Sequence, residues 1–180
     1  MGWSFKIGTV NGIAIKIHLT FFFVIIWAMA RGSSGFGGAH GALVATVSIL
    51  LLFVCVMLHE LGHSLTALHF GIRVRDITLL PIGGIARLET LPERPLHELL
   101  ITLAGPMVNF ALVIILVLVL ALVGGAGLFL DLDQLAYLLA GPRTSALSLI
   151  VYLLAANLLL GLFNLLPAFP MDGGRVLRAF

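Results

Sequence analysis

Charged residues are scarce in this 180-residue chain. Lys, Arg, Asp and Glu together make up 10% of the sequence, whereas 61% is hydrophobic and the mean hydropathy is +1.17. A soluble globular domain carries about 25% charged residues, so this composition excludes that class and predicts a membrane protein. The few charges sum to a formal net charge of +2, which gives no basis for expecting a nucleic-acid partner.

Cysteine is nearly absent as well, because Cys55 is the only one and lies in an apolar run. A lone cysteine excludes an intramolecular disulfide, and we interpret Cys55 as a small core residue rather than a nucleophile. What the sequence has in abundance is long uncharged stretches. Since a membrane-crossing helix needs about 20 apolar residues, we predict spans at about 19–30, 42–70, 99–123 and 147–166. The expected fold class is therefore membrane, mainly α: a polytopic helical bundle of at least four spans.

Two segments show a different pattern. Residues 5–17 contain two apolar runs on either side of Asn11-Gly12, a dipeptide typical of a two-residue hairpin turn. Residues 73–88 contain short β-like runs that are interrupted at Pro81 and Gly83. We therefore expect residues ~5–17 and ~73–88 to form a small β-sheet on the cytoplasmic side.

The pentad His59-Glu60-Leu61-Gly62-His63 follows an uncharged stretch that begins at Gly41. Residues four apart share one face of a helix, so His59 and His63 can bind one metal ion, and Glu60 is placed to take a proton from a water molecule there. Ionisable groups inside an apolar span are costly unless they are paired or coordinated. We therefore interpret the pentad as a metal site rather than a buried hydrogen-bonded cluster, and the ligand types suit one zinc ion.

Asp172 is the best-placed third ligand. It follows an uncharged stretch from Thr144 to Met171, and the two glycines after it allow the backbone to approach another element closely. The alternative is that Asp172 only caps a short helix that begins at Gly173.

Other candidate ligands fit less well. His69 has the spacing of metzincins, but Thr66 stands where those enzymes need a glycine to turn the chain. We expect His69 to be a polar residue at a helix end. Glu89, Glu93 and Glu98 lie in a charge-mixed segment that we expect to be solvated.

The distribution of basic residues predicts an orientation. With the N-terminus in the cytoplasm, the outer loops hold only Arg31 and Arg143. The inner segments hold Lys6, Lys16, Arg73, Arg75, Arg87, Arg94, Arg175 and Arg178. By the positive-inside rule we expect a multi-pass protein of the cell membrane, with the N-terminus and the active-site end cytoplasmic.

Three motifs in this order resemble the site-2 proteases, which are intramembrane zinc metalloproteases. They are HELGH at 59–63, AGPMVN at 104–109 and FNLLPAFPMDGG at 163–174, and the resemblance covers essentially the whole chain. Within the second motif, we expect Asn109 to hydrogen-bond backbone that Pro106 frees.

The resemblance implies a role for five residues. His59, His63 and Asp172 would be the zinc ligands, and Glu60 the catalytic base. Asn164 would be a second catalytic residue that hydrogen-bonds the substrate or the developing oxyanion. For Asn164, a hydrogen bond between helices is the alternative.

The expected function is that of an intramembrane zinc endopeptidase, which cleaves transmembrane segments of membrane-anchored proteins in regulated intramembrane proteolysis. The implied partners are single-span membrane proteins, such as membrane-tethered transcription regulators or anti-sigma factors, and the lipid bilayer, with no nucleic acid. The alternative is a non-enzymatic membrane zinc-binding protein, a transporter or sensor, which would not explain a glutamate directly after the first histidine. We expect residues 1–180 to form a single intramembrane metalloprotease domain, truncated at its C-terminus relative to the family.

Overall fold

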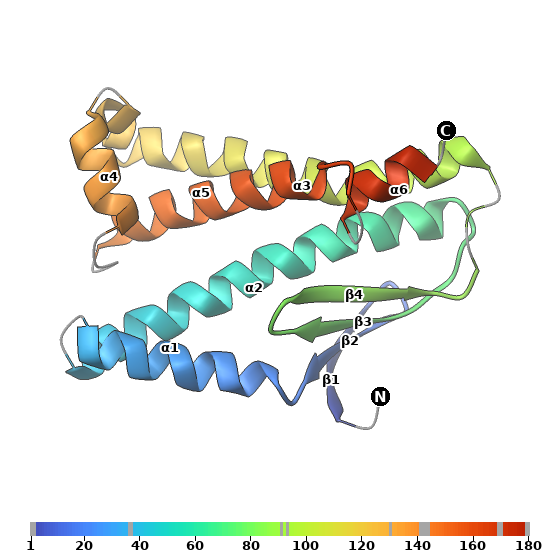
Figure 1. Cartoon of the computed structure of the whole chain (residues 1–180), viewed down its shortest axis with the longest axis horizontal. Coiled ribbons are helices and arrows are strands. Elements are labelled where there is room, and N and C mark those ends of the chain that lie inside the picture. The colour runs from blue at the N-terminus through green and yellow to red at the C-terminus, as the bar shows by residue number, and fades with distance from the viewer. Residues whose placement is uncertain are drawn as a thin grey trace.

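The computed structural model describes residues 3–35, 38–90, 92, 94–129, 131–140, 145–168 and 171–178. The helices are α1 (Phe21–Gly35), α2 (Gly38–His69), α3 (Pro95–Leu122), α4 (Leu132–Ala140), α5 (Ala146–Asn164) and α6 (Asp172–Arg178), with a 3₁₀ turn η1 (Gly125–Phe129). The strands are β1 (Ser4–Val10), β2 (Ile13–His18), β3 (Val74–Leu80) and β4 (Gly83–Leu88). The predicted class, a mainly helical membrane protein with a small sheet, is confirmed (Figure 1).

Three of the described helices, α2, α3 and α5, are long and apolar enough to cross a membrane. They correspond to the second, third and fourth predicted spans. The first predicted span corresponds to α1, a shorter apolar helix of 15 residues. At 1.5 Å per residue α1 is about 22 Å long, which is less than the roughly 30 Å of a hydrocarbon core.

The long helix α2 runs through the middle of the molecule (Figure 1). Helix α1 and the sheet lie on one side of α2, and α3 with α5 lie on the other. Helix α2 approaches α3 closely at Gly62, where an added Cβ would lie 2.8 Å from the Ala104 carbonyl oxygen. Small residues of this kind let helix backbones approach each other in membrane bundles.

The four strands form one sheet in the order β1-β2-β3-β4. Strands β1 and β2 make the predicted antiparallel hairpin, and Asn11 (φ 46°) and Gly12 (φ 83°) both adopt the positive φ that a type I′ turn requires. Strand β2 pairs in parallel with β3, which pairs antiparallel with β4. The predicted sheet is therefore present, and β1 and β4 are its edges.

One apolar cluster joins the sheet to the pentad region of the bundle. Ile13 and Ile77 from the sheet are fully buried and pack in the same cluster as Leu61 of α2 and Ile101 of α3. The sheet is thereby fixed beneath the part of α2 that carries His59 and His63.

Buried Asp76 of β3 ties three strands together. Its carboxylate accepts a hydrogen bond from Lys16 Nζ of β2 at 2.7 Å and lies 3.4 Å from Arg87 Nε of β4. Burial alone would raise the pKa of Asp76, but the hydrogen bond and charge of Lys16, together with Arg87, hold that pKa below its ordinary value. The carboxylate is therefore charged at neutral pH.

The segment between α3 and α5, where an outer loop with Arg143 was expected, contains structure of its own. Turn η1 and helix α4 pack against the far ends of α3 and α5 through Leu120, Leu128, Leu138 and Val151. Arg143, assigned to this loop, lies outside the described residues.

Candidate active site

His59 and His63 lie one turn apart on α2, in the last third of an uninterrupted helix. Both are buried, with 4% and 6% of their surface exposed, and their Nε2 atoms are 3.1 Å apart. The i, i+4 spacing therefore produces a pair of imidazoles that turn the same ring atom toward one point.

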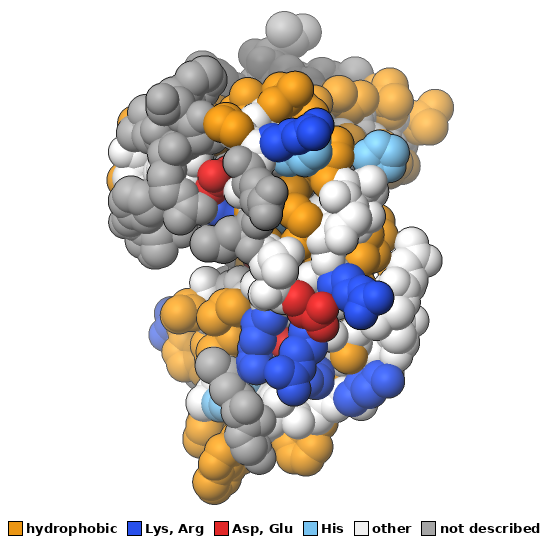
Figure 2. All heavy atoms as spheres, turned by 90° about the vertical axis from the view of Figure 1, so that its right-hand side faces the viewer, with side chains coloured by type: hydrophobic (Ala, Val, Ile, Leu, Met, Phe, Trp, Pro, Cys, Tyr) orange, Lys and Arg blue, Asp and Glu red, His pale blue; other side chains and the backbone are white. Residues whose placement is uncertain are grey.

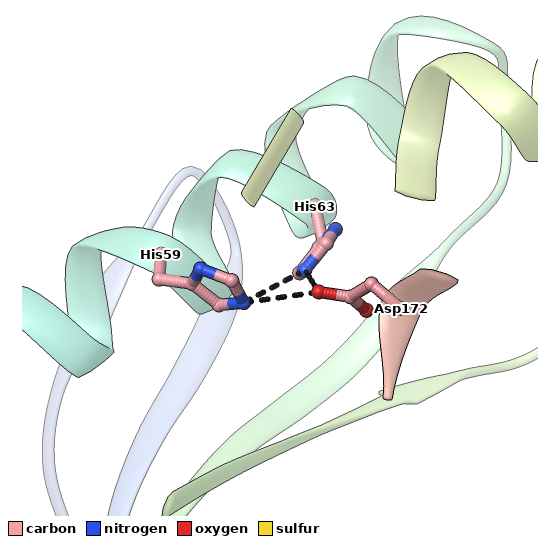
Figure 3. Close-up of side chains that lie close together, drawn as sticks. All are labelled: His59, His63 and Asp172. Carbon is pink, nitrogen blue, oxygen red and sulfur yellow. Dashed lines mark hydrogen bonds and ion pairs between the residues drawn. The ribbon is translucent and has the colours of Figure 1, made fainter. Parts of the chain in front are cut away.

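Asp172, the first residue of α6, reaches the same point from more than a hundred residues along the chain (Figure 3). Its Oδ2 lies 3.2 Å from His59 Nε2 and 3.1 Å from His63 Nε2. Figure 3 shows the three side chains pointing toward one another from α2 and from the start of α6.

Gly173 makes this placement of Asp172 possible. An added Cβ at Gly173 would lie 2.2 Å from the Leu166 carbonyl oxygen and 2.4 Å from that of Leu165, just after the end of α5. Only a residue without a side chain allows α6 to begin so close to the end of α5.

The three residues fit one zinc ion. One ligand atom from each of His59, His63 and Asp172 lies within 4.8 Å of the others. Two ligands about 2.1 Å from a tetrahedral zinc are roughly 3.4 Å apart, which is close to the 3.1–3.2 Å separations found here. Two imidazoles and one carboxylate are also a ligand set of catalytic zinc sites, in which a further position stays open.

Glu60 lies beside this cluster and faces the β3–β4 hairpin. An added Cβ at Gly84 would lie 2.4 Å from Glu60 Cγ, so the strand passes directly over this side chain. Glu60 and Gly84 both line a cavity of about 900 Å³ that also reaches His59, His63 and Asp172. The carboxyl group is therefore at the cavity, next to the three candidate ligands.

Asn164, the predicted second catalytic residue, also lines this cavity. Its Nδ2 donates to the Leu160 carbonyl oxygen within α5, at 3.0 Å. The hydrogen bond described is thus within one helix, not the bond between helices that was the alternative.

Helix α3 supports both imidazoles, which was not expected. His63 Nδ1 lies 2.7 Å from the Ile101 carbonyl oxygen, and His59 Nδ1 lies 3.0 Å from the Asn109 amide nitrogen. An added Cβ at Gly105, between these two positions, would lie 2.1 Å from His63 Nε2. Residues 101, 105 and 109 are spaced four apart, so all three lie on one face of α3. This spacing is the feature of the sequence from which their contact with the histidines could have been predicted.

The expected bond from Asn109 to backbone near Pro106 is replaced by this contact with His59. Among the other candidate ligands, His69 is exposed at the end of α2 and Glu89 is exposed after β4. Glu98, expected to be solvated, is instead buried in the first turn of α3 and has an interaction partner. Glu93 lies outside the described residues.

Comparison with known proteins finds relatives that match nearly the whole chain. The chain is 39% identical over 179 residues to a zinc metalloprotease of Methanocaldococcus jannaschii, a match that covers 99% of this chain and 46% of the relative. It is 30% identical over 164 residues to Stage IV sporulation protein FB of Bacillus subtilis, covering 91% of this chain and 46% of that protein. The chain thus spans about half the length of the curated relatives it matches.

A solved structure, the Site-2 Protease from Methanocaldococcus jannaschii, has a similar fold. The TM-score is 0.66 at 40% identity, over 98% of this chain and 71% of that chain. The sequence also matches peptidase family M50 over residues 47–180, a range that contains the pentad, Asn109, Asn164 and Asp172. The chain therefore belongs to peptidase family M50, the family of the site-2 proteases.

Proposed function

We propose that residues 1–180 form a single intramembrane metalloprotease domain, a zinc endopeptidase that cleaves transmembrane segments of membrane-anchored proteins. The observation that carries this proposal is that His59 and His63, on a helix of membrane-spanning length, meet Asp172 of α6, with Glu60 beside them. In this proposal His59, His63 and Asp172 are the zinc ligands and Glu60 is the catalytic base.

Peptide hydrolysis needs proton transfers that Glu60 is placed to perform. When bound, zinc supplies a Lewis acid that polarises the scissile carbonyl group and water. Glu60 takes a proton from the attacking water and passes it to the leaving amine nitrogen. Its position on the cavity wall, one residue after His59, supports this role.

Asn164 has the second catalytic role in this proposal. From the cavity wall its amide group hydrogen-bonds the substrate backbone or the oxyanion that develops on the carbonyl oxygen. Nδ2 carries two protons and donates one of them to the Leu160 carbonyl oxygen, so the other is the donor to the substrate in this proposal.

The cavity and the sheet indicate how a transmembrane segment would be held. The cavity wall is mostly apolar along α2 and α5, which suits an apolar substrate. Its other wall is the turn and start of β4, an edge strand. A helix hides its carbonyl groups in its own hydrogen bonds, so the substrate unwinds and adds to this edge as an extended strand.

The proposed substrates are single-span membrane proteins, such as membrane-tethered transcription regulators or anti-sigma factors. Apart from these substrates, the proposed partner is the lipid bilayer. The proposal includes no nucleic acid.

We place the N-terminus and the active-site end of the bundle in the cytoplasm. Lys and Arg side chains gather on the end of the molecule that carries the sheet (Figure 2). The positive-inside rule assigns that end to the cytoplasm.

The deciding experiment compares Glu60→Gln with the unaltered chain in detergent or liposomes that contain a single-span model substrate. Zinc content is expected to stay near one per chain, whereas cleavage falls by a factor on the order of 10² or more, as for the loss of a general base. Glu89→Gln, which neutralises an exposed glutamate after β4, is the control and should cleave normally.

Unchanged cleavage in Glu60→Gln would contradict the mechanism. Bound zinc in the unaltered chain without any cleavage would instead favour a non-enzymatic zinc protein, a transporter or sensor.

A further inference from the structure

Asn109 presents a polar contact that the proposed mechanism does not use. It is fully buried in α3, and its Nδ2 lies 3.0 Å from His59 Nδ1. Its other amide atom, Oδ1, is also buried and has no hydrogen-bond partner among the residues that the structure describes. A buried amide that faces a histidine of the site therefore needs a physical explanation.

The position of the imidazole determines which of its nitrogens can carry a proton. His59 Nε2 is the atom that faces His63 Nε2 and Asp172 Oδ2. In a zinc site this atom must offer its lone pair, so the proton of the neutral ring must lie on Nδ1. Nδ1 is then a donor, and the group opposite must accept.

Asn109 meets this requirement when its oxygen, rather than its nitrogen, faces His59. The two amide atoms occupy nearly the same places when the group is rotated by 180°, so the choice follows from the hydrogen-bonding partner. The rotated amide gives Oδ1 a donor and puts Nδ2 in the place that Oδ1 now has, so the reason for the rotation is the proton on His59 Nδ1.

We infer that Asn109 is a positioning residue of the metal site: its Oδ1 accepts a hydrogen bond from His59 Nδ1–H and holds Nε2 free for zinc. The inference rests on the proposed function, because it presupposes that His59 binds the metal. Asn109 acts only through His59 and does not touch the substrate.

The second histidine supports this inference through a parallel contact. His63 Nδ1 lies 2.7 Å from the Ile101 carbonyl oxygen, which can only accept, so the His63 ring has the same tautomer with Nε2 toward the cluster. Ile101 and Asn109 are eight residues apart on α3, on one face. One helix thus supplies an acceptor to each imidazole, one from its backbone and one from a side chain.

The test measures the zinc affinity of purified protein by competition with a chelator. Asn109→Leu keeps the branching of the side chain but removes the acceptor, and should weaken zinc binding about 10- to 100-fold. Asn109→Asp keeps an acceptor oxygen and should stay within about threefold of the unaltered chain, as in the carboxylate–histidine–zinc arrangement.

Asn157 provides a matched control in the same chain. It is also a fully buried asparagine of a membrane-length helix, but its Nδ2 donates to the Leu153 carbonyl oxygen within α5. Asn157→Leu should therefore leave zinc affinity unchanged. Equal losses in Asn109→Leu and Asn157→Leu, or a loss in Asn109→Asp as large as in Asn109→Leu, would overturn the inference.

A measurement on the unaltered chain covers the case in which Asn109→Leu does not fold. Nitrogen-15 NMR of histidine-labelled, zinc-loaded protein should show His59 protonated at Nδ1 and not at Nε2. The opposite tautomer would overturn the inference while leaving zinc binding intact. Absence of zinc from the unaltered chain would overturn the proposed metal site as well, so the two failures are distinguishable.

Discussion

In the middle of α3, Gly105 lies directly against the ring of His63, and Asn109 lies against His59. Near the C-terminal end of the same helix, Leu120 packs in a cluster of aliphatic side chains from η1, α4 and α5. At the site, α3 contacts imidazole rings whose positions are fixed by their neighbours. Around Leu120, it contacts flexible aliphatic side chains that can change rotamer. The comparison teaches that substitutions in these two regions should affect different quantities: zinc binding in the site region around Gly105 and Asn109, and folding stability in the far region around Leu120.

The largest effect is expected when a carboxylate is removed at the metal site. Asp172→Ala should lose zinc and, with it, cleavage by a factor on the order of 10² or more, because two histidines alone do not complete a catalytic zinc site. Metal analysis and a cleavage assay measure the two effects.

The same substitution at Asp131, in the far region, is the control. Its Oδ1 accepts from the Gln134 backbone amide at the start of α4. Asp131→Ala should leave zinc content unchanged and weaken only the start of α4, by about 1 kcal/mol. Zinc retained at full stoichiometry in Asp172→Ala would remove Asp172 from the ligand set.

A second comparison adds one methyl group to a glycine in each region. Gly105→Ala places a Cβ 2.1 Å from His63 Nε2, so the ring must leave its position and zinc affinity should fall at least tenfold. Gly125→Ala brings its Cβ to 2.6 Å from Leu120 Cδ1, the end of a flexible side chain that can move away. Chelator competition should find normal affinity in Gly125→Ala, and equal affinities in the two variants would contradict the distinction.

A third prediction concerns stability alone. Leu120 is 1% exposed, and Leu120→Ala should lower the free energy of unfolding by about 2 kcal/mol or more through the cavity that it leaves. Leu122→Ala, at a position 86% exposed, should have little effect. Denaturant unfolding in detergent measures both, and zinc affinity of the folded Leu120→Ala protein should stay normal. A loss of zinc affinity in Leu120→Ala would show that the two regions are coupled.

The smallest effect is expected from the sheet and depends on pH. The pKa of Asp76 is lower in the folded protein than in the unfolded chain, so its pairing with Lys16 and Arg87 stabilises the fold above about pH 4. This contribution is lost as the pH falls through the lowered pKa. Asp76→Asn should be less stable than the unaltered chain at pH 7, by about 1–2 kcal/mol, and the difference should shrink in acid. A constant difference at all pH values would assign the effect to packing.

Local chemistry explains which features could be predicted from the sequence. The Asn11-Gly12 turn was predictable because two adjacent positive φ angles favour that dipeptide. The helical pairing of His59 with His63 follows from a fixed spacing on one helix. The role of Asp172 as third ligand stays a prediction, although the structure places its carboxylate beside both histidines.

The contacts between helices could not be predicted in the same way. Whether Asn109 meets His59 depends on the angle and depth at which α3 packs on α2, and the sequence of α3 does not determine these alone. The burial of Glu98 likewise results from where α3 begins and what covers its first turn. The mixture of charges around Glu98 in the sequence does not predict this burial.

The parallel pairing of β2 with β3 has a consequence for biogenesis. Strand β2 ends at His18 and β3 begins at Val74, and all of α1 and α2 lies between them. During synthesis the β1–β2 hairpin is complete early, but its partner emerges only after both helices. The sheet therefore closes only once α1 and α2 have both been made and the chain has returned to the hairpin. Protection from hydrogen exchange of those β2 amides that face β3, rather than β1, would report in a nascent chain that this helical pair has formed.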